Sequence, residues 1–251
     1  MTQFACQTIT WGPETLEDNY ETVLKEVGAI GYQGVETRCG ILMRHKEKLK
    51  SWLEQYKIEI VAAHLGVTGL QEKSPKAMAE ILDTLEVLKV KYVLFSAPKE
   101  ATAADFREYA RLLEQLGKDV RRRGMRICFH NHNWELENEC ELLSLLTELT
   151  NPEHVGLAVD FGWVLQSDVE LQTFLTTFQH RIQYVHLKDV LERNWVELGH
   201  GRLELPKLIE FLNPLQLPWW TVEQDTTLKS PSESTKLSYE YLVQMVQEKG
   251  R

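Results

Sequence analysis

The sequence lacks any run of about 18 apolar residues, which is the length that a membrane-spanning helix needs. Its first residues, MTQFACQTIT, have neither the basic lead nor the apolar stretch of a secretion signal. Cysteine is scarce, and no two cysteines form a CxxC pair; the four are Cys6, Cys39, Cys128 and Cys140. These absences predict a soluble, cytoplasmic protein with reduced thiols and no membrane partner.

Positive charge is also in deficit. The 251 residues include 28 Lys and Arg against 37 Asp and Glu, so the formal net charge is −9. A surface that binds nucleic acid is basic, and this balance therefore argues against a nucleic-acid partner. With 43% hydrophobic and 26% charged residues, the chain has the composition of an ordinary globular protein that buries a large core.

The glycine-rich turn of a dinucleotide-binding fold is missing as well. A Rossmann domain would carry GxGxxG directly after its first strand, where this chain has Thr10-Trp11-Gly12-Pro13. The only other candidate, Gly199-His200-Gly201, is too short and lies in the wrong place. No phosphate-cradling loop is therefore expected.

What the sequence does contain is a regular alternation of short β-rich runs and longer stretches of helical period. Strands are predicted at residues 4–9, 34–37, 59–63, 91–96, 125–130, 155–160, 182–186 and 219–223. Helices are predicted at residues 14–27, 43–56, 74–88, 101–123, 139–149, 169–178 and 239–246. No linker rich in proline or glycine divides the series, and its length suits one barrel. The pattern predicts an α/β protein, a single (β/α)8 TIM barrel over residues 1–251.

Polar side chains end the last four predicted strands, at the carboxyl edge where such a barrel builds its active site. They are His130 and His132 with Glu135 close behind, then Asp160, His186 and Glu223. Carboxylates buried side by side cost several kcal/mol unless a cation joins them. The pattern thus predicts a divalent metal, and mixed oxygen and imidazole ligands suit manganese, zinc, cobalt or iron better than calcium.

Several segments resemble the xylose isomerase-like TIM-barrel superfamily of sugar (phosphate) isomerases and epimerases. They are FHNHNWELE, LAVDFGW, YVHLKD, ELGHGRLELPKLIEFL and WWTVEQD, all in the second half of the chain. The resemblance implies one divalent ion at the barrel mouth, with ligands at Asp160, His186 and Glu223. Magnesium is then a further possible metal. It also implies a small sugar or polyol as substrate, and it leaves a homo-oligomer open.

The fifth strand departs from the family's pattern. Many relatives have Glu-Asn-His there, whereas this chain has His130-Asn131-His132 and its nearest carboxylate is Glu135. Inosose dehydratases resemble this chain in having a His-x-His at that point. Both His130 and Glu135 are therefore candidates for the fourth ligand. Glu135 is the preferred expectation, because three carboxylates and one imidazole suit a hard cation.

Three further residues are candidates for contacts with substrate hydroxyls or with the sugar ring. Glu36 ends the second strand and His64 the third, while Trp134 could supply an apolar wall. Each could equally serve only the packing or hydrogen bonding of the fold.

Lys188 lies two residues beyond His186 and on the same alternating face of its strand. It could bind a carboxylate, phosphate or enolate oxygen of the substrate. The alternative is an ion pair with Asp189 or Glu135.

The leading hypothesis is a metal-dependent isomerase or epimerase of a keto or aldo sugar, a sugar phosphate or a cyclic polyol. Glu223 would abstract a proton, with His130, His132 or Glu135 delivering one on the other side and Lys188 assisting. A lyase that dehydrates a keto sugar or inosose is the alternative. Further possibilities are a noncatalytic sugar-binding barrel, which would carry no metal, and an apurinic endonuclease, which would need more metal ligands and a basic surface.

Overall fold

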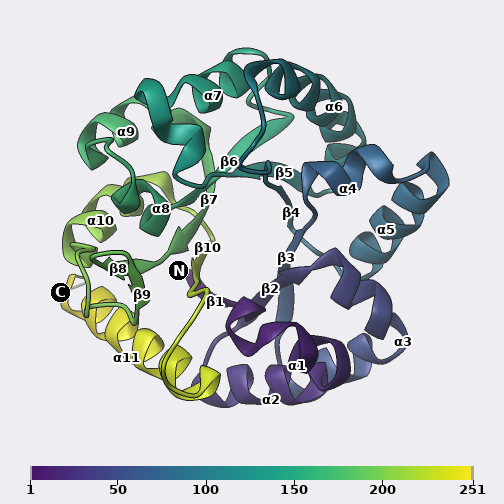
Figure 1. The fold of residues 1–251 in the computed structure, drawn as a ribbon. Helices are drawn as coiled ribbons and strands as arrows, with labels where there is room; N and C mark the ends of the chain where they lie inside the picture. The colour runs from purple at the N-terminus through teal and green to yellow at the C-terminus, as the bar shows by residue number, and fades with distance from the viewer. Residues whose placement is uncertain (1, 250–251) are drawn as a thin grey trace.

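Eight parallel strands close into a barrel in this computed structural model, which describes residues 2–249, the side chains of Thr68 and Lys249 apart. Around the barrel the order is β1-β10-β7-β6-β5-β4-β3-β2, and the helices form a ring outside it (Figure 1). The strands are β1 (Gln3–Gln7), β2 (Gly34–Arg38), β3 (Glu59–His64), β4 (Tyr92–Phe95), β5 (Arg126–His130), β6 (Val155–Asp160), β7 (Ile182–Leu187) and β10 (Trp219–Val222). The prediction of a single (β/α)8 barrel is confirmed.

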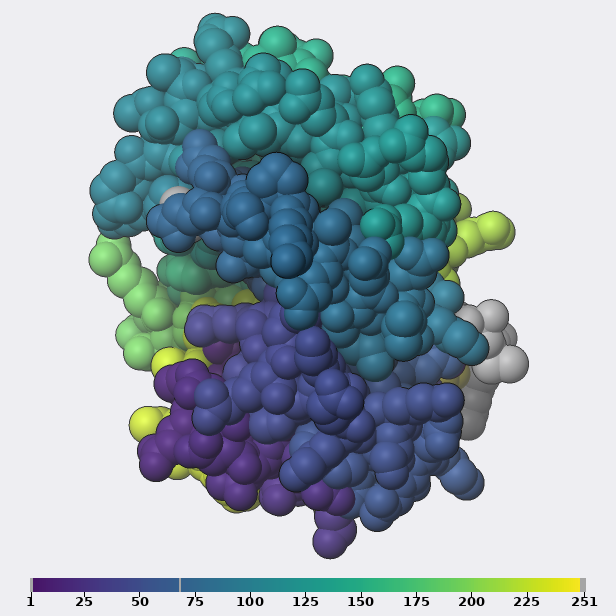
Figure 2. Space-filling view, turned by 90° about the vertical axis from the view of Figure 1, so that its right-hand side faces the viewer, coloured from purple at the N-terminus to yellow at the C-terminus, as the bar shows by residue number. Residues whose placement is uncertain are grey.

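The α-helices pack against the outer face of this barrel. They are α1 (Gly12–Asp18), α2 (Tyr20–Ile30), α3 (Cys39–Tyr56), α4 (Val67–Glu72), α5 (Pro75–Val87), α6 (Ala103–Arg122), α7 (Glu137–Glu148), α8 (Phe161–Gln166), α9 (Leu171–Phe178), α10 (Leu205–Leu212) and α11 (Pro231–Lys249). The last helix, α11, contacts α2 and so closes the ring (Figure 1). Figure 2 shows the flank on the right-hand side of Figure 1, where the colours pass from purple through blue to teal.

Helix α6 shows how the sequence sets these elements. Thr102 and Asp105 form a reciprocal capping box at its start, which satisfies free N–H groups of the first turn. Phe106, Tyr109 and Leu113 then recur at helical spacing and are buried. Two arginines in its last turn face the negative end of the helix dipole. Local signals and packing thus agree over the whole helix.

The interior of the barrel is filled by side chains and is separate from the larger apolar layer between strands and helices. Tyr92 and Tyr184 lie in this interior with their rings 4.8 Å apart, together with Trp219. Small residues such as Ala62 and Ala158 make room for these rings. The barrel is therefore a packed core and not a pore, and its polar residues gather above that core at the carboxyl ends of the strands.

The structure adds elements that the periodicity did not predict. The helix expected at residues 14–27 is two helices separated at Asn19. Three short helices, α4, α8 and α10, are new, and a two-stranded antiparallel ribbon, β8 (Asp189–Leu191) with β9 (Asn194–Val196), follows β7. Each is eight residues or shorter, which is too brief for a helical or alternating pattern to stand out. Within the described residues, no helix is long and apolar enough to cross a membrane.

Candidate metal centre at the mouth of the barrel

Four polar side chains converge where the last four barrel strands end. His130, Asp160 and His186 lie on β5, β6 and β7, and Glu223 directly follows β10. Each offers one donor atom, and these four atoms lie within 4.8 Å of one another. All four residues are buried. The register explains the convergence, because Asp160 pairs with His186 across β6 and β7 and parallel strands carry their carboxyl ends to one edge.

His130 is buried without a hydrogen-bond partner at either ring nitrogen. Its Nε2 lies 3.5 Å from Oδ2 of Asp160. Burial lowers the pKa of His130 well below its usual range, and the neighbouring His132 and His186 lower it further. The ring is therefore neutral at pH 7, with a free lone pair. A buried polar group without a partner is costly, and a metal ion is the partner that a neutral imidazole accepts.

His186 is held from both sides. Its Nε2 donates to Oε2 of Glu36 at 2.7 Å, and its Nδ1 lies 2.8 Å from Oε2 of Glu223 and 3.8 Å from Oδ2 of Asp160. Burial acts to lower the pKa of His186, but the carboxylates of Glu36 and Glu223 outweigh it and raise that pKa well above its usual range. Nδ1 thus faces the carboxylates, where either a proton or a metal ion would sit.

Lys188 is fully buried among three carboxylates. Its Nζ lies 2.6 Å from Asp225, 3.0 Å from Glu223 and 3.4 Å from Asp160. These partners raise the pKa of Lys188 above its usual value although burial opposes them. The lysine is therefore a fixed positive charge beside the cluster.

The alternative partners expected for Lys188 were wrong. Asp189 points away and accepts from the backbone N–H groups of Val190, Gly199, Gly201 and Leu203, so it organises the loop after the ribbon. Two indole rings lie close to the Lys188 ammonium group. Its Nζ is 4.9 Å from the ring centre of Trp163 and 4.2 Å from that of Trp195.

The charges of this buried group do not balance without a further cation. Glu36, Asp160, Glu223 and Asp225 supply four carboxylates, and the facing cations are Lys188 and a protonated His186. Two negative charges are left over. An ion bound at Nδ1 of His186 would take the place of its proton, so a divalent ion would cancel two of the three negative charges that then remain. Burial raises the pKa of Asp160 and of Asp225 in spite of the nearby lysine, and the neighbouring Glu223 carboxylate raises both further.

The structure does not bring Glu135 into this group. The chain turns into a short 3-10 helix, η2 (Trp134–Leu136), and the Glu135 carboxylate folds back to accept the backbone N–H of His132 at 2.8 Å. Its other oxygen lies 3.7 Å from Nδ1 of His132. The preferred expectation for the fourth ligand is therefore not met, because five residues beyond the strand end the side chain is used by its own loop. His130, the other candidate, takes that place.

Two further candidates for substrate contacts were Glu36, which lies on β2, and His64, which ends β3. Glu36 is buried and hydrogen-bonded to His186, and it does not line the cavity described below, so a substrate contact for it is not supported. The pKa of Glu36 is raised by burial, which His186 partly offsets. His64 does line that cavity and shares a 3.0 Å hydrogen bond with Oγ of Ser96.

Aromatic rings form one wall of the site. His132 stacks on Trp134, with ring centres 3.9 Å apart and planes inclined by 12°. Trp163 stands edge-on to His132 at 5.4 Å. His132 and Trp163 line the cavity, whereas Trp134 lies behind His132 and supports it. Trp134 is thus placed to orient the imidazole, and it does not form the sugar wall that was expected.

The cavity above the cluster has a volume of about 420 Å³, within the range of small-molecule sites. It is bordered by loops from most of the strands, and its lining consists of Gln7, Ile9, Arg38, Gly40, His64, Leu65, Gly66, Ser96, His130, His132, Trp163, Glu223 and Asp225. Two members of the cluster, His130 and Glu223, are among them, so a ligand in this cavity would meet the metal centre.

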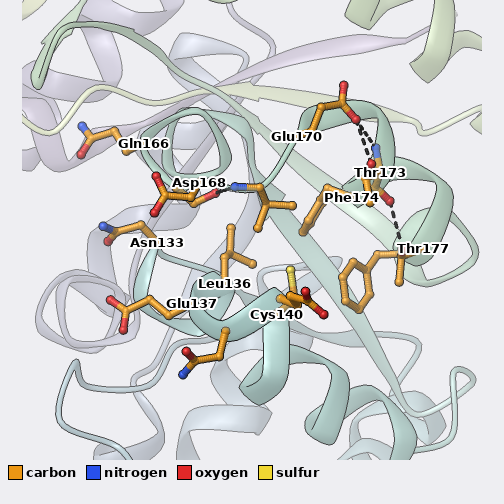
Figure 3. Close-up of a pocket in the computed structure, with 15 residues that line it drawn as sticks. Asn133, Leu136, Glu137, Cys140, Gln166, Asp168, Glu170, Thr173, Phe174 and Thr177 are labelled. Atoms are coloured by element: carbon orange, nitrogen blue, oxygen red, sulfur yellow. Dashed lines mark hydrogen bonds between the residues drawn. The ribbon is translucent and has the colours of Figure 1, made fainter.

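A larger cavity of about 860 Å³ lies elsewhere, between α7 and the segment that joins α8 to α9 (Figure 3). Leu136, Cys140 and Phe174 supply its apolar lining, and Glu137 and Asp168 lie at its edge. None of the four clustered residues lines it. The chemistry, and not the size of the hollow, therefore selects the smaller cavity as the candidate site.

Two residues of the site were missed in the sequence. Asp225 lies two positions beyond Glu223, and Arg38 two positions beyond Glu36, so alternation places each on the same face as the residue that was predicted. That spacing was the available signal.

Comparison with known proteins agrees with this geometry. A family model described as the xylose isomerase-like TIM barrel matches residues 24–244. The chain belongs to that family. It is 26% identical to an inosose dehydratase of Geobacillus kaustophilus, over 92% of this chain and 89% of the relative.

Two solved structures share the fold of this family member. A sugar phosphate isomerase/epimerase from Parabacteroides distasonis superposes with a TM-score of 0.78 at 17% identity, covering 98% of this chain and 96% of that one. The IolI protein, whose crystal structure holds a zinc atom, gives a TM-score of 0.74 at 15% identity and covers 98% and 99%.

Proposed function

We propose that this protein is a metal-dependent lyase that removes water from a keto sugar or a cyclic keto-polyol. The observation that carries the proposal is the buried group of His130, Asp160, His186 and Glu223, which opens on a cavity lined by further imidazoles.

The donor set fits a divalent ion, because two imidazoles and two carboxylates converge and the buried charge is two units too negative. Such ligands suit manganese, zinc, cobalt or iron, and the zinc atom in the crystal structure of IolI supports a bound metal in a protein of this fold. When bound, the ion would polarise the substrate's carbonyl and stabilise the negative charge that develops as the neighbouring proton leaves.

Glu223 is the proposed base. It lines the cavity, and Lys188 donates to its Oε1 at 3.0 Å. Burial acts to raise the pKa of Glu223, but Lys188 and His186 outweigh it and hold that pKa well below its usual range. The carboxylate is therefore ionised and able to take the proton from the carbon next to the carbonyl.

His132 is the proposed acid. It is the second residue after β5, lines the same cavity and keeps 18% of its side chain exposed. The stacked Trp134 and the Glu135 carboxylate fix the ring and its backbone. In the elimination, the α C–H bond breaks and its proton goes to Glu223. The β C–O bond then breaks, and the hydroxyl leaves as water with a proton from His132, which yields a conjugated enone.

The residues at β5 favour elimination over epimerisation. Epimerases of this family use two glutamates on opposite faces of one carbon, and here the β5 position carries His130. The similarity to inosose dehydratases supports the same choice. The isomerase or epimerase expected first is the second candidate, since it shares the initial proton abstraction and resembles the Parabacteroides structure in fold.

A role as an endonuclease is not supported. Over residues 2–249, apart from the side chains of Thr68 and Lys249, a single cluster of four metal-binding groups is found, whereas an apurinic endonuclease would need additional His and carboxylate ligands. The net charge of −9 also opposes contact with a phosphate backbone.

The proposal is tested by proton NMR in D₂O. Manganese-loaded protein is incubated with inososes and ketoses, and we expect signals and ultraviolet absorbance of an enone that disappear when the metal is chelated. His132→Gln should lose the elimination, while His180→Gln serves as the matched control, because His180 is exposed and lies in the short 3-10 helix after α9, outside the cavity. Deuterium incorporation without loss of water would instead establish the isomerase or epimerase. If no compound of the panel loses water or incorporates deuterium, both candidate functions are overturned.

A further inference from the structure

One arginine reaches the cavity above the metal centre. Arg38 is the last residue of β2, is exposed, and lines the cavity together with Gly40, His64 and Ser96. Of the residues that line this cavity, Arg38 alone is a lysine or arginine. The nearby positive charge of Lys188 is already engaged by three carboxylates.

The Arg38 guanidinium has no protein partner in the part of the chain that the structure describes, since no hydrogen bond or ion pair joins it to a side chain or backbone group. Arg44, six residues along on α3, behaves differently and pairs with Asp18 at 3.2 Å. In a chain with nine excess negative charges, a guanidinium left free at the edge of a cavity is available to a ligand.

The wall beside Arg38 is open and rich in donors. Arg38 is also the N-cap of α3, an 18-residue helix whose first turn is not capped by any side chain. A Cβ atom placed on Gly40 would meet nothing within 4 Å, so space lies next to that turn. The hydroxyl of Ser96, bonded to His64, lies on the same wall.

The cavity that Arg38 lines also reaches the candidate metal centre. His130, 3% exposed and without a partner at either ring nitrogen, lines the same cavity as Arg38, and so does Glu223. A molecule that reaches the metal centre therefore also has Arg38 in the wall around it.

We propose that Arg38 binds an anionic group of the substrate, a carboxylate or a phosphate, at a point away from the reacting carbons. This rests on the proposed function and narrows it, because the substrate class becomes an acidic keto sugar or keto-polyol. A planar guanidinium presents two parallel N–H donors that match carboxylate and phosphate oxygens. A neutral sugar offers no group that uses them equally well.

Isothermal titration of the metal-loaded protein tests this with three related compounds. D-Fructose is the neutral probe, fructose 6-phosphate the phosphate arm and 5-keto-D-gluconate the carboxylate arm. We expect at least one acidic compound to bind about 10- to 100-fold more tightly than fructose. Arg38→Gln should remove that preference, so that this variant binds the acidic compounds no more tightly than it binds fructose. Arg38→Lys should keep part of the preference for the acidic compound. Arg44→Gln, the control on the adjoining helix α3, should keep all of that preference.

The inference is overturned if neither acidic compound binds better than fructose, or if the preference survives Arg38→Gln. A parallel assay of solvent proton exchange separates this from failure of the proposed function. Metal-dependent exchange with no anion preference would remove only the role of Arg38. Arg38-dependent anion binding without exchange on any keto compound would remove only the proposed chemistry.

Discussion

Nε2 of His186 donates a 2.7 Å hydrogen bond to Oε2 of Glu36, and this bond turns the opposite ring nitrogen, Nδ1, toward Glu223. Both residues are completely buried. A carboxylate that holds the outer nitrogen of a ligating histidine fixes its tautomer and raises its basicity. Glu36 therefore has a place in the metal centre that is different from the substrate contact expected for it.

The first prediction concerns this pair. Glu36→Leu should weaken the affinity for manganese or zinc by about 10- to 100-fold, because the His186 ring loses the group that orients it. Glu36→Gln keeps a hydrogen-bond acceptor but not the charge, so its metal affinity should lie between that of Glu36→Leu and that of the native protein. Metal titration with a competing chelator measures both, with Glu59→Gln, an exposed residue at the other end of the barrel, as control. Unchanged affinity in Glu36→Leu would show that the hydrogen bond serves only packing.

The second prediction separates the two candidates for the fourth ligand. His130→Gln should lose much of the metal affinity, since His130 offers a free nitrogen within the cluster. Glu135→Gln should keep the metal but lower turnover, because the Glu135 carboxylate holds the backbone of His132. The two variants are compared by elemental analysis of their metal content and by kinetics on the same preparations. The reverse pattern would restore Glu135 as the ligand.

The third prediction concerns Lys188, whose removal leaves three carboxylates facing one another. Lys188→Met should destabilise the metal-free protein by about 3–5 kcal/mol, the usual cost of breaking a buried charge pair from one side. Added manganese should restore more stability in this variant than in the native protein, because the ion replaces the missing charge. Urea unfolding with and without metal gives both values. Equal stabilisation of the two proteins by metal would contradict the charge balance described here.

Sequence alone predicted the barrel well because its strands are short apolar runs between amphipathic helices. The strand predicted at residues 155–160 matches β6 at both ends, and its last residue, Asp160, was predicted as a ligand and lies in the cluster. The carboxyl ends of the strands in a parallel barrel lie close together whatever the conformation of the loops. Asp160, His186 and Glu223 could therefore be predicted from the sequence to form one group.

Loop geometry limited the rest. Whether Glu135 turns inward or back onto its own loop depends on the 3-10 turn at residues 134–136, which spacing does not encode. The bond between His186 and Glu36 joins residues 150 positions apart across the barrel, and no local pattern reveals such a pair. The β8–β9 ribbon that brings Trp195 over Lys188 is likewise too short to be seen as a period.

The fourth prediction concerns alkaline pH. Cys39 is buried, and burial raises the pKa of its thiol from 9.0 to about 12. Above pH 9 the unfolded thiol ionises and the folded one does not, so its contribution to stability is complete below pH 9 and declines as the pH rises toward 12. The gap in unfolding free energy between the native protein and Cys39→Ala should shrink by about 1.4 kcal/mol per pH unit in that window. Urea titrations at pH 8 to 10.5 measure it, and a gap that stays constant would show that Cys39 is accessible to solvent.

The central claim is that His130, Asp160, His186 and Glu223 hold one divalent ion that the chemistry requires. Calorimetric titration of the chelator-treated protein with manganese tests it most directly, with Asp160→Ala measured beside the native chain. We predict about one ion bound per native chain, strong loss of binding in Asp160→Ala, and unchanged circular dichroism in the variant. No binding to the native chain, or full binding by Asp160→Ala, would contradict the account.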